Sequence, residues 1–282
     1  MGTYVVTGSG SGMGKVTAEK LRDDGHTVIG IDLKGGDITA DLSTDSGRKA
    51  AIAATLEACG GTLDGAVFAA GLGPGPGREH VILEVNYFGT VQLLTAFHSA
   101  LAASGNAKVV VFSSNSTTTT PLVPASTIKA LLAGNVDKAL RPLKKFRDNA
   151  PAFAYGGSKI ALSRWMRRLA VTPEWAGAGI RLNAIAPGAI LTPLLQAQLD
   201  DPELAPAIEK FPVPTGGFGT AEGIAQWVML MLSPAADFLC GSVIFVDGGT
   251  DAYFRSDDWP KPVPLTGLSR YLRLTKEFAT RK

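Results

Sequence analysis

Short runs of β-branched and other apolar residues alternate along this chain with segments whose apolar residues have helical spacing. Consecutive parallel strands need a crossover between them, so this alternation predicts a parallel sheet with right-handed crossovers. The strand-like runs are Tyr4–Thr7, Thr27–Asp32, Gly65–Ala70, Lys108–Ser113, Ile180–Ile185 and Val243–Asp247, and helical spacing covers Val16–Leu21 and Val91–Leu101. The predicted fold class is α/β, a doubly wound parallel sheet with helices on both faces.

The length and composition favour one domain over two. A chain of 282 residues lies within the range of single α/β domains. Hydrophobic residues make up 45% of it and charged residues 18%, which is enough apolar material for a sizeable core. We expect one domain over residues 1–254, with an insertion at about 117–150, and a basic tail over 255–282.

The insertion follows from the spacing of the predicted elements. About forty residues separate Ser114 from Tyr155, which is too many for a bare connection. Their apolar residues have helical spacing after Ser126, which we interpret as a helix cap. These residues are Ile128, Leu131, Leu132, Val136, Leu140 and Leu143. One additional amphipathic helix is therefore predicted, either near the substrate or at a subunit interface.

The tail is polar, basic and rich in proline. Three prolines at positions 260, 262 and 264 precede a predicted short helix over Leu268–Phe278. Chain termini are often loosely held, so we interpret the tail as a solvated arm in preference to a subunit contact or a cover over a pocket.

Charge and hydropathy exclude several classes of partner. The net charge is +2, so the whole-chain balance gives no electrostatic case for binding nucleic acid or a membrane surface. The first strand-like run starts almost at Met1, and no apolar run reaches the roughly 18 residues of a membrane span. We expect a soluble cytoplasmic protein.

The cysteines and histidines give no metal or disulfide pattern. Cys59 and Cys240 cannot form a disulfide framework, and both are expected to be buried thiols. His26, His80 and His98 lie far apart without partners at ligand spacing, so we interpret them as structural or surface residues and predict no metal site.

A glycine-rich turn follows the first predicted strand. Gly8, Gly12 and Gly14 have the spacing Gly-x3-Gly-x-Gly, which departs from the Gly-x-Gly-x-x-Gly of the general dinucleotide fingerprint. The physical basis is shared, because residues without Cβ allow a tight turn and let a pyrophosphate approach backbone N–H groups at a helix N-terminus.

An acidic residue supports the nucleotide interpretation. Asp32 ends the second predicted strand eighteen residues after Gly14, close to the spacing of an acid that binds the adenosine ribose. A carboxylate there accepts from both ribose hydroxyls and repels a 2′-phosphate, so NAD(H) is favoured over NADP(H). Lys34 is the dissenting residue, because a cation just past the strand could meet a 2′-phosphate.

Tyr155 and Lys159 are four residues apart on a predicted helix that begins at Tyr155. This spacing places the phenol and the ammonium on one helical face. Alone, such a pair is common on protein surfaces. Together with the glycine-rich turn and Asp32 it indicates an acid–base site beside a dinucleotide.

With these features the chain resembles the short-chain dehydrogenase/reductase family. The matching segments are Thr7–Gly14, Asp32, Asp41-Leu42, Asn86 in Glu-Val-Asn-Tyr-Phe-Gly, Ser113-Ser114, Tyr155, Lys159, Arg181–Gly188 with Thr192, and Asp247–Gly249. The lengthened segment before Tyr155 is most similar to the bacterial 3α-hydroxysteroid dehydrogenase/carbonyl reductase branch. The resemblance extends to about Phe254 and implies a Rossmann-type sheet of about seven strands.

The resemblance also implies catalytic roles. Tyr155 would be the acid–base residue, and the ammonium of Lys159 would lower the pKa of its phenol from about 10 toward the operating pH. Lys159 would also hold the nicotinamide ribose. Ser114, with Ser113 as the fallback, would hold the substrate oxygen, and Asn86 would position Lys159 through water.

Further positions are implied as cofactor contacts. They are Gly8, Ser11, Gly12, Met13, Gly14, Asp32, Asp41, Leu42, Ala70, Gly71, Tyr155, Lys159, Pro187, Gly188, Ile190 and Thr192. The sequence departs from the family at Phe68-Ala69, where Asn-Asn is usual, which removes one set of stabilising amides. Gly71 still permits backbone approach to the cofactor.

The substrate side is apolar. Leu194, Leu195, Leu199, Ile208 and Phe211 suit a hydrophobic alcohol or ketone, or they only pack a lid onto the core. Residues Thr117–Thr120 could border a pocket, although an ordinary loop is the preferred interpretation.

The leading hypothesis is an NAD(H)-dependent oxidoreductase for a secondary alcohol or ketone, with a 3α-hydroxysteroid or another hydrophobic cyclic compound as substrate. One alternative is a non-catalytic NAD(H)-sensing regulator on the same fold. Another is a dehydrogenase for a terpenoid or aryl alcohol. Family habit implies a homodimer or homotetramer.

Overall fold

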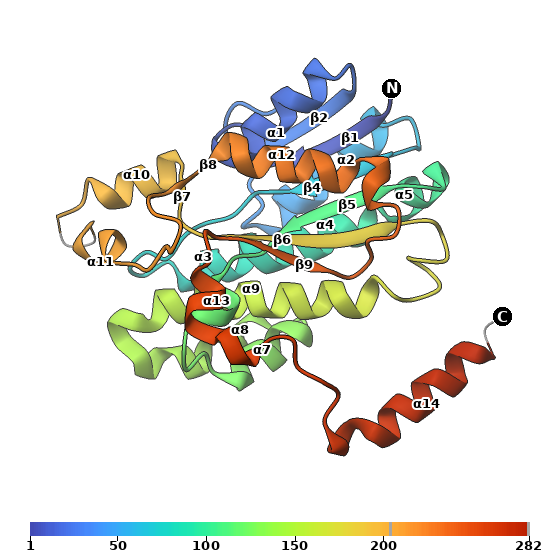
Figure 1. Cartoon of the computed structure of the whole chain (residues 1–282). Coiled ribbons are helices and arrows are strands. Elements are labelled where there is room, and N and C mark those ends of the chain that lie inside the picture. Colours follow the sequence, from blue (N-terminus) through green and yellow to red (C-terminus); the bar gives the residue numbers. More distant parts are fainter. Residues whose placement is uncertain (203–204, 281–282) are drawn as a thin grey trace.

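The computed structural model describes residues 1–202 and 205–280. Its centre is a parallel sheet of seven strands in the order β3-β2-β1-β4-β5-β6-β9 (Figure 1). The strands are β1 (Thr3–Thr7), β2 (Thr27–Asp32), β3 (Ile38–Thr39), β4 (Gly65–Phe68), β5 (Lys108–Phe112), β6 (Arg181–Pro187) and β9 (Val243–Val246). The predicted doubly wound α/β fold is confirmed, and the six strand-like runs of the sequence form six of these strands.

Alternate residues of the strands face opposite layers of helices. On one face, Tyr4 and Val6 pack with α1 (Gly12–Asp23) and α12 (Ala221–Leu232). On the other, Val5 belongs to a core that includes residues of four helices. These helices are α2 (Asp45–Ala58), α4 (Thr90–Ala96), α5 (His98–Ser104) and α9 (Ala150–Leu169). The strands are predominantly apolar on both faces because helices cover both faces of the sheet.

The order of the strands reverses between β1 and β4. The chain moves outward from β1 to β2 and β3, then returns to pair β4 with the other edge of β1, with Val5 opposite both Ile29 and Ala66. In such sheets a crevice forms beyond the carboxyl ends of the strands at this switch point. The loops after β1, β4, β5 and β6 all open there.

The remaining short elements lie between these helices and strands or in the C-terminal tail. They are α3 (Glu79–Leu83), a π-helical segment at Glu84–Gly89, α6 (Ser116–Thr119), α10 (Pro193–Leu199), α11 (Ala205–Glu209), 3₁₀ turns at Pro234–Ala236, Ser256–Asp258 and Leu265–Gly267, and the two-stranded pair of β7 (Ile190–Leu191) with β8 (Gly219–Thr220).

The insertion differs from the single helix predicted for it. It contains α7 (Ala125–Leu132), α8 (Val136–Leu140) and a 3₁₀ segment over Arg141–Asn149. The break falls at Gly134, whose φ is +73°, and Asn135 caps α8 by accepting a hydrogen bond from the Lys138 N–H at 2.8 Å. Pro124, rather than Ser126, occupies the cap position of α7.

The insertion packs onto the body of the protein. Ile128, Leu131 and Leu143 are buried in a core shared with residues of α3 and α9. The helix carrying Tyr155 also differs from the prediction, since α9 begins at Ala150. The five additional residues at its start contribute buried Ala150 and Ala154 to this core, which explains why the helix extends toward the insertion.

The tail leaves the body after α13 (Thr250–Arg255). The helix predicted near Leu268–Phe278 is confirmed as α14 (Leu268–Ala279), and it stands away from the rest of the molecule (Figure 1). No residue of α14 is buried.

Of the two cysteines, Cys59 is buried as predicted, whereas Cys240 is only half-buried.

Candidate active site

The glycine-rich turn joins β1 to α1 at the switch point. Gly8 has φ +73°, and a Cβ there would lie 2.7 Å from the Ala70 backbone nitrogen. A Cβ on Gly14 would lie 2.2 Å from the Gly8 carbonyl oxygen. Because glycine has no side chain, the backbone is in close contact at both positions. A residue with a Cβ atom at either position would push the contacting backbone segments apart.

Asp32 holds this turn from the end of β2. Its Oδ2 accepts a hydrogen bond from the Gly10 N–H at 2.9 Å, and its Oδ1 accepts from the Lys34 N–H at 3.1 Å. Gly10 was not among the predicted site residues, although a Cβ there would lie only 2.1 Å from the Lys34 carbonyl oxygen. Lys34 contributes its backbone to this arrangement, and its side chain is exposed.

A cavity of about 430 Å³ opens beside the turn. Eleven of the predicted cofactor contacts line it: Gly8, Ser11, Gly12, Met13, Gly14, Asp32, Asp41, Leu42, Ala70, Gly71 and Thr192. Leu42 is buried, while Asp41 is exposed and its carboxylate accepts from the Ser43 N–H at 2.9 Å. Hydrogen bonds from Ser43 lower the pKa of Asp41, so it carries a negative charge at the rim.

A second cavity, of about 580 Å³, continues from the first. Both are lined by Met13, Ala69, Gly71, Leu72, Thr192 and Leu194, so the two form one cleft. The second cavity contains Ser114, Tyr155, Lys159, Pro187, Gly188 and Ile190. Of the predicted site residues, Asn86 alone does not line either cavity.

Lys159 lies at the inner wall of the second cavity. Its side chain is buried, and its Nζ donates a hydrogen bond to the Phe112 carbonyl oxygen at 2.7 Å. Burial disfavours the charged form and lowers the pKa of Lys159 from 10.5 to about 8. An ammonium has three donors, so two N–H groups remain for other acceptors.

Tyr155 lies on the same face of α9, with Lys159 Nζ 5.8 Å from the centre of its ring. Burial raises the pKa of Tyr155 above 10.0, and a hydrogen bond with Ser114 opposes this by a smaller amount. The predicted lowering of this pKa is therefore wrong for the structure. The spacing of Tyr155 and Lys159 indicates the attraction of the ammonium, whereas the desolvation of the phenol depends on the surrounding tertiary structure.

The two adjacent serines at the end of β5 have different surroundings. The Ser113 hydroxyl is hydrogen-bonded to the Ser163 hydroxyl at 2.7 Å inside the protein. The Ser114 Oγ accepts from the Ser116 N–H at 3.1 Å and is within hydrogen-bonding reach of Tyr155. Ser114 is therefore the serine whose hydroxyl lies beside the phenol.

Asn86 lies behind the cleft in the π-helical segment. It is fully buried, so the simple alternative of a surface or capping asparagine does not apply. Its Oδ1 accepts from the Leu72 N–H at 2.7 Å, and its Nδ2 donates to the Leu72 carbonyl oxygen at 2.9 Å. A Cβ on Gly71 would lie 3.3 Å from Asn86 Oδ1 and 3.5 Å from Lys159 Nζ. Asn86 thus fixes the backbone that borders Lys159.

The segment after β6 closes the outer side of the cleft. A Cβ on Gly188 would lie 2.7 Å from the Asp247 Cα, so this glycine lets the β6 and β9 ends approach. The Thr192 hydroxyl caps α10 by accepting from the Leu195 N–H at 3.4 Å. Four of the five predicted lid residues, Leu194, Leu195, Ile208 and Phe211, line the second cavity, and Leu199 ends α10.

Comparison with known proteins agrees with this geometry. Residues 144–251 match a family model described as enoyl-(acyl carrier protein) reductase. The chain is 39% identical over 255 residues to a 3-alpha-hydroxysteroid dehydrogenase/carbonyl reductase of Comamonas testosteroni, a match that spans 90% of this chain and 98% of that protein. This chain belongs to the short-chain dehydrogenase/reductase family.

Solved structures show the same relationship. The 3-alpha-hydroxysteroid dehydrogenase of Pseudomonas sp. B-0831, crystallised with NADH, superposes with a TM-score of 0.85 at 40% identity, covering 90% of this chain and 99% of that one. Levodione reductase has a TM-score of 0.68 at 26% identity, over 89% of this chain and 97% of that one.

The family's usual Asn-Asn pair is replaced here by Phe68-Ala69. Phe68 is buried and stacks on Phe97 with ring centres 6.4 Å apart, so it serves the core. Ala69 lines both cavities. The backbone is instead held by the Thr7 hydroxyl, which accepts from the Ala70 N–H at 3.2 Å.

Several lining residues of this short-chain dehydrogenase/reductase were missed by the sequence analysis. Thr119 and Thr120 line the second cavity, so their interpretation as an ordinary loop is wrong. Gln198 also lines it, and Arg78 lines the first cavity. The Gly-Pro-Gly-Pro-Gly run before Arg78 is a loop signal that could have placed this cation at the crevice.

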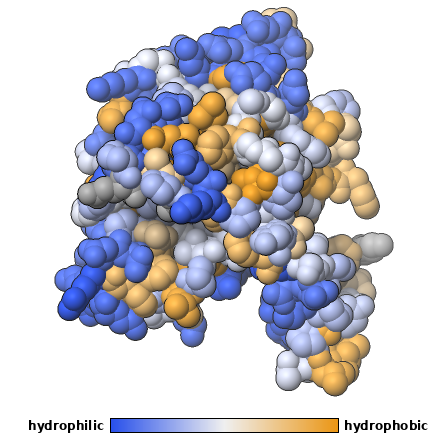
Figure 2. Space-filling model, turned by 60° about the vertical axis from the view of Figure 1, so that its left-hand side comes forward, coloured by the Kyte–Doolittle hydropathy of each residue, from blue (hydrophilic) through white to orange (hydrophobic). Residues whose placement is uncertain are grey.

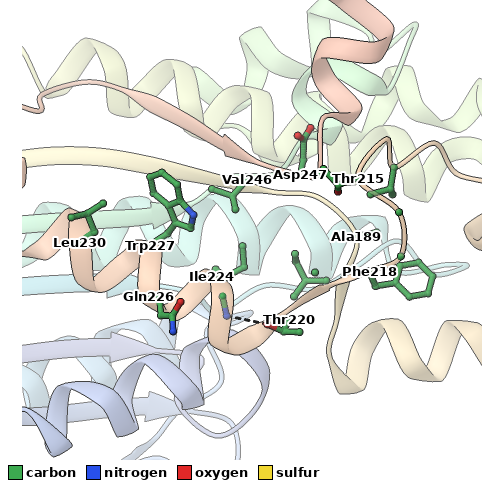
Figure 3. Close-up of a pocket in the computed structure, with 17 residues that line it drawn as sticks. Ala189, Thr215, Phe218, Thr220, Ile224, Gln226, Trp227, Leu230, Val246 and Asp247 are labelled. Atoms are coloured by element: carbon green, nitrogen blue, oxygen red, sulfur yellow. Dashed lines mark hydrogen bonds between the residues drawn. The ribbon is translucent and has the colours of Figure 1, made fainter.

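A third cavity, of about 440 Å³, lies between α12 and the segment 213–220 (Figure 3). The charged residue in its lining is Asp247, whose carboxylate accepts from the Gly249 and Asp251 N–H groups at 3.1 and 2.8 Å at the start of α13. Among the described residues, the lining of this third cavity contains no acid–base pair. Within the same described residues, no group of histidine, cysteine and carboxylate side chains could hold a metal ion.

Proposed function

We propose that this protein is an NAD(H)-dependent oxidoreductase that interconverts a secondary alcohol and its ketone. The observation that carries the proposal is the position of Tyr155, Lys159 and Ser114 in one cavity that continues into the glycine-lined cavity beside Asp32. The Pseudomonas relative was crystallised with NADH, which supports the same cofactor.

The residues of the first cavity fit a dinucleotide. The close backbone contacts at Gly8 and Gly14 leave no space for side chains and keep the turn open for a phosphate group. Asp32 would accept from the adenosine ribose hydroxyls and disfavour a 2′-phosphate, so NAD(H) is preferred over NADP(H). When bound, the nicotinamide would accept or supply a hydride at its C4 atom.

Tyr155 would transfer the proton of the substrate hydroxyl. Its raised pKa keeps the phenol protonated at neutral pH, which suits the donation of a proton to a ketone oxygen during reduction. Oxidation needs the phenolate, which the Lys159 ammonium and the Ser114 hydrogen bond would stabilise. Lys159 would also donate to the nicotinamide ribose, and Ser114 would hold the substrate oxygen beside the phenol.

Asn86 would act as a positioning residue. Its two hydrogen bonds to Leu72 set the path of the backbone next to Lys159, and a third contact of 3.5 Å reaches the Ser158 hydroxyl on the same helix as Lys159. Its side chain would fix the wall of the cleft that the ammonium faces.

The substrate would be a hydrophobic cyclic alcohol or ketone. The apolar lid residues face the cavity that contains Tyr155, so they are placed to contact a substrate as well as to pack the lid. Relatives that act on hydroxysteroids support a 3α-hydroxysteroid. The polar side chains of Thr119, Thr120 and Gln198 would contact its oxygen substituents.

We also propose a cytoplasmic location and a homodimeric or homotetrameric assembly. No helix of the described residues is long and apolar enough to cross a membrane. Light scattering at micromolar concentration tests the assembly, and a monomer would contradict it.

The decisive experiment compares Tyr155→Phe with the wild type. A panel of steroid, terpenoid and aryl alcohols is screened with NAD and NADP separately, following absorbance of the reduced nicotinamide. The variant should lose at least about 99% of turnover, since general acid–base catalysis contributes roughly 10² to 10⁴ in rate. Tyr253→Phe, which alters an exposed phenol on α13, is the matched control. Retained turnover in Tyr155→Phe would show that the mechanism is wrong.

A further inference from the structure

Helix α14 exposes a large apolar surface away from the body of the protein. Leu272 is 59% exposed and Phe278 61% exposed, and no residue of the helix is buried. The other exposed apolar side chains of this segment are Leu265, Leu268, Tyr271 and Leu274. In Figure 2 the tail forms a separate lobe at the lower right, hydrophilic on one side and hydrophobic on another.

The residues of α14 separate cleanly into two faces. Leu268, Tyr271 and Leu272 have the spacing i, i+3 and i+4, and Thr275 and Ala279 continue the same stripe. Arg270, Arg273, Lys276 and Glu277 occupy the opposite face, where Arg273 pairs with Glu277 at 3.4 Å. A helix that is apolar along one side and cationic along the other is typical of a segment that lies at a membrane surface.

The charge of the chain is distributed unevenly between the body and the tail. Residues 255–282 contain seven basic and three acidic residues, a net charge of +4, whereas the whole chain has +2. Residues 1–254 therefore carry a net charge of −2. The whole-chain value concealed this asymmetry, which is why it gave no electrostatic case for a membrane surface.

The segment before α14 is an exposed spacer between the body of the protein and the helix. Residues Trp259 and Val263 are 68% and 61% exposed, and the prolines at positions 260, 262 and 264 favour an extended spacer. An exposed tryptophan near a basic amphipathic helix is typical of the membrane interface, where aromatic rings are enriched. α14 has twelve residues, too few to span a bilayer.

We propose that α14 docks this protein on an anionic lipid surface, lying flat with Leu268, Tyr271, Leu272 and Phe278 in the acyl boundary and its cations toward the headgroups. The excess of positive charge in the tail and its separation from the apolar face fit an anionic bilayer, where the cations would meet the headgroups while the apolar face enters the acyl boundary. The proposal does not depend on the catalytic assignment.

The test is cosedimentation of the full chain with vesicles of phosphatidylcholine alone or mixed with phosphatidylglycerol. The wild type should bind the anionic vesicles, bind neutral vesicles at least about tenfold more weakly, and dissociate as salt increases. A chain truncated after Asp258 should not bind either vesicle, and it should retain wild-type turnover because the cleft is intact.

Two substitutions on α14 add the same charge to different faces. Ser269→Glu alters the polar side and should weaken binding about fivefold through charge alone. Leu272→Glu alters the apolar side and should weaken it about fiftyfold or more, because the buried leucine is lost as well. Circular dichroism of both variants should match the wild type.

Three results would overturn the proposal. Equal binding to neutral and anionic vesicles would remove the role of the cations. Equal effects of Ser269→Glu and Leu272→Glu would show that the apolar face is not inserted. A lower oligomeric mass for the truncated chain than for the full chain, measured by light scattering without lipid, would place a second copy on this face.

Discussion

Replacing Lys159 by methionine should stabilise the cofactor-free protein at neutral pH while abolishing its turnover. The buried ammonium is disfavoured by desolvation, which lowers its pKa from 10.5 to about 8. A change of this size corresponds to roughly 3 kcal/mol of folding free energy at pH 7. Methionine fills a similar volume without charge, but the Phe112 carbonyl loses a donor, which costs about 1 kcal/mol. The net gain should be about 2 kcal/mol.

The pH dependence separates this mechanism from a simple improvement in packing. Below about pH 8 the folded and unfolded chains both bind the proton, so the folded state carries the full desolvation cost. Between about pH 8 and 10.5 the unfolded chain holds a proton that the folded chain has released, so the stability of the wild type rises with pH. The advantage of Lys159→Met should therefore shrink by about 2 kcal/mol between pH 7 and pH 9.5.

Urea unfolding of both proteins at pH 7 and pH 9.5, without nucleotide, measures this difference. A separate thermal unfolding experiment at pH 7 should show the gain as a rise in melting temperature of about 5 °C. Lys129→Met, which removes an exposed ammonium on α7, is the control and should change stability by less than about 0.5 kcal/mol at both pH values. The reasoning is refuted if Lys159→Met is less stable than the wild type at pH 7, or if its advantage is the same at both pH values.

Three other predictions follow, two from the cleft and one from the buried ion pair between Arg48 on α2 and Glu84 in the π-helical segment. Burial raises the pKa of Tyr155, so kcat/KM for alcohol oxidation should increase from pH 6 to pH 8, where Lys159 still carries its proton, while ketone reduction stays nearly constant. A flat oxidation profile in initial-rate measurements over this range would contradict this. Gly14→Ala places a Cβ 2.2 Å from the Gly8 carbonyl oxygen, so the NADH Kd from fluorescence titration should rise at least about tenfold, and unchanged affinity would show that the turn does not bind the cofactor. Arg48→Met leaves the buried Glu84 carboxylate without the partner that lies 2.8 Å away, and should lower the free energy of unfolding in urea by about 3 kcal/mol. The double variant Arg48→Met/Glu84→Met should recover most of this loss. Equal losses of stability in the single and double variants would exclude an uncompensated charge as the cause.

The fold was predictable because its signal is local and repeated. Six apolar runs separated by helical spacing predicted a parallel α/β sheet, and the strand Ile38–Thr39, with only two residues, is too short to show such a run. The single helix predicted in the insertion failed because Gly134 adopts a positive φ and Asn135 caps a new helix there. The helical spacing of the apolar residues continues through this break, whereas the helical backbone conformation ends at it.

The candidate site was predictable as a set of residues but not in its energetics. The glycines, Asp32, Tyr155 and Lys159 are separated widely along the chain. The carboxyl ends of the parallel strands meet at one edge of the sheet, and α9 places Tyr155 and Lys159 in the same cleft. Thr119 and Thr120 line the pocket although an ordinary loop was the preferred interpretation, because a threonine run has no spacing that distinguishes a pocket wall from a loop.

The sequence by itself determined the fold class, the segments that form the strands around the site and the chemical types at the site, because these depend on local patterns and on spacing. The tertiary structure decided that Ser114 rather than Ser113 meets Tyr155, that burial raises the Tyr155 pKa despite the nearby ammonium, and that the apolar face of α14 remains uncovered. These properties depend on which side chains are removed from water, and distant segments of the chain decide that only when they pack together.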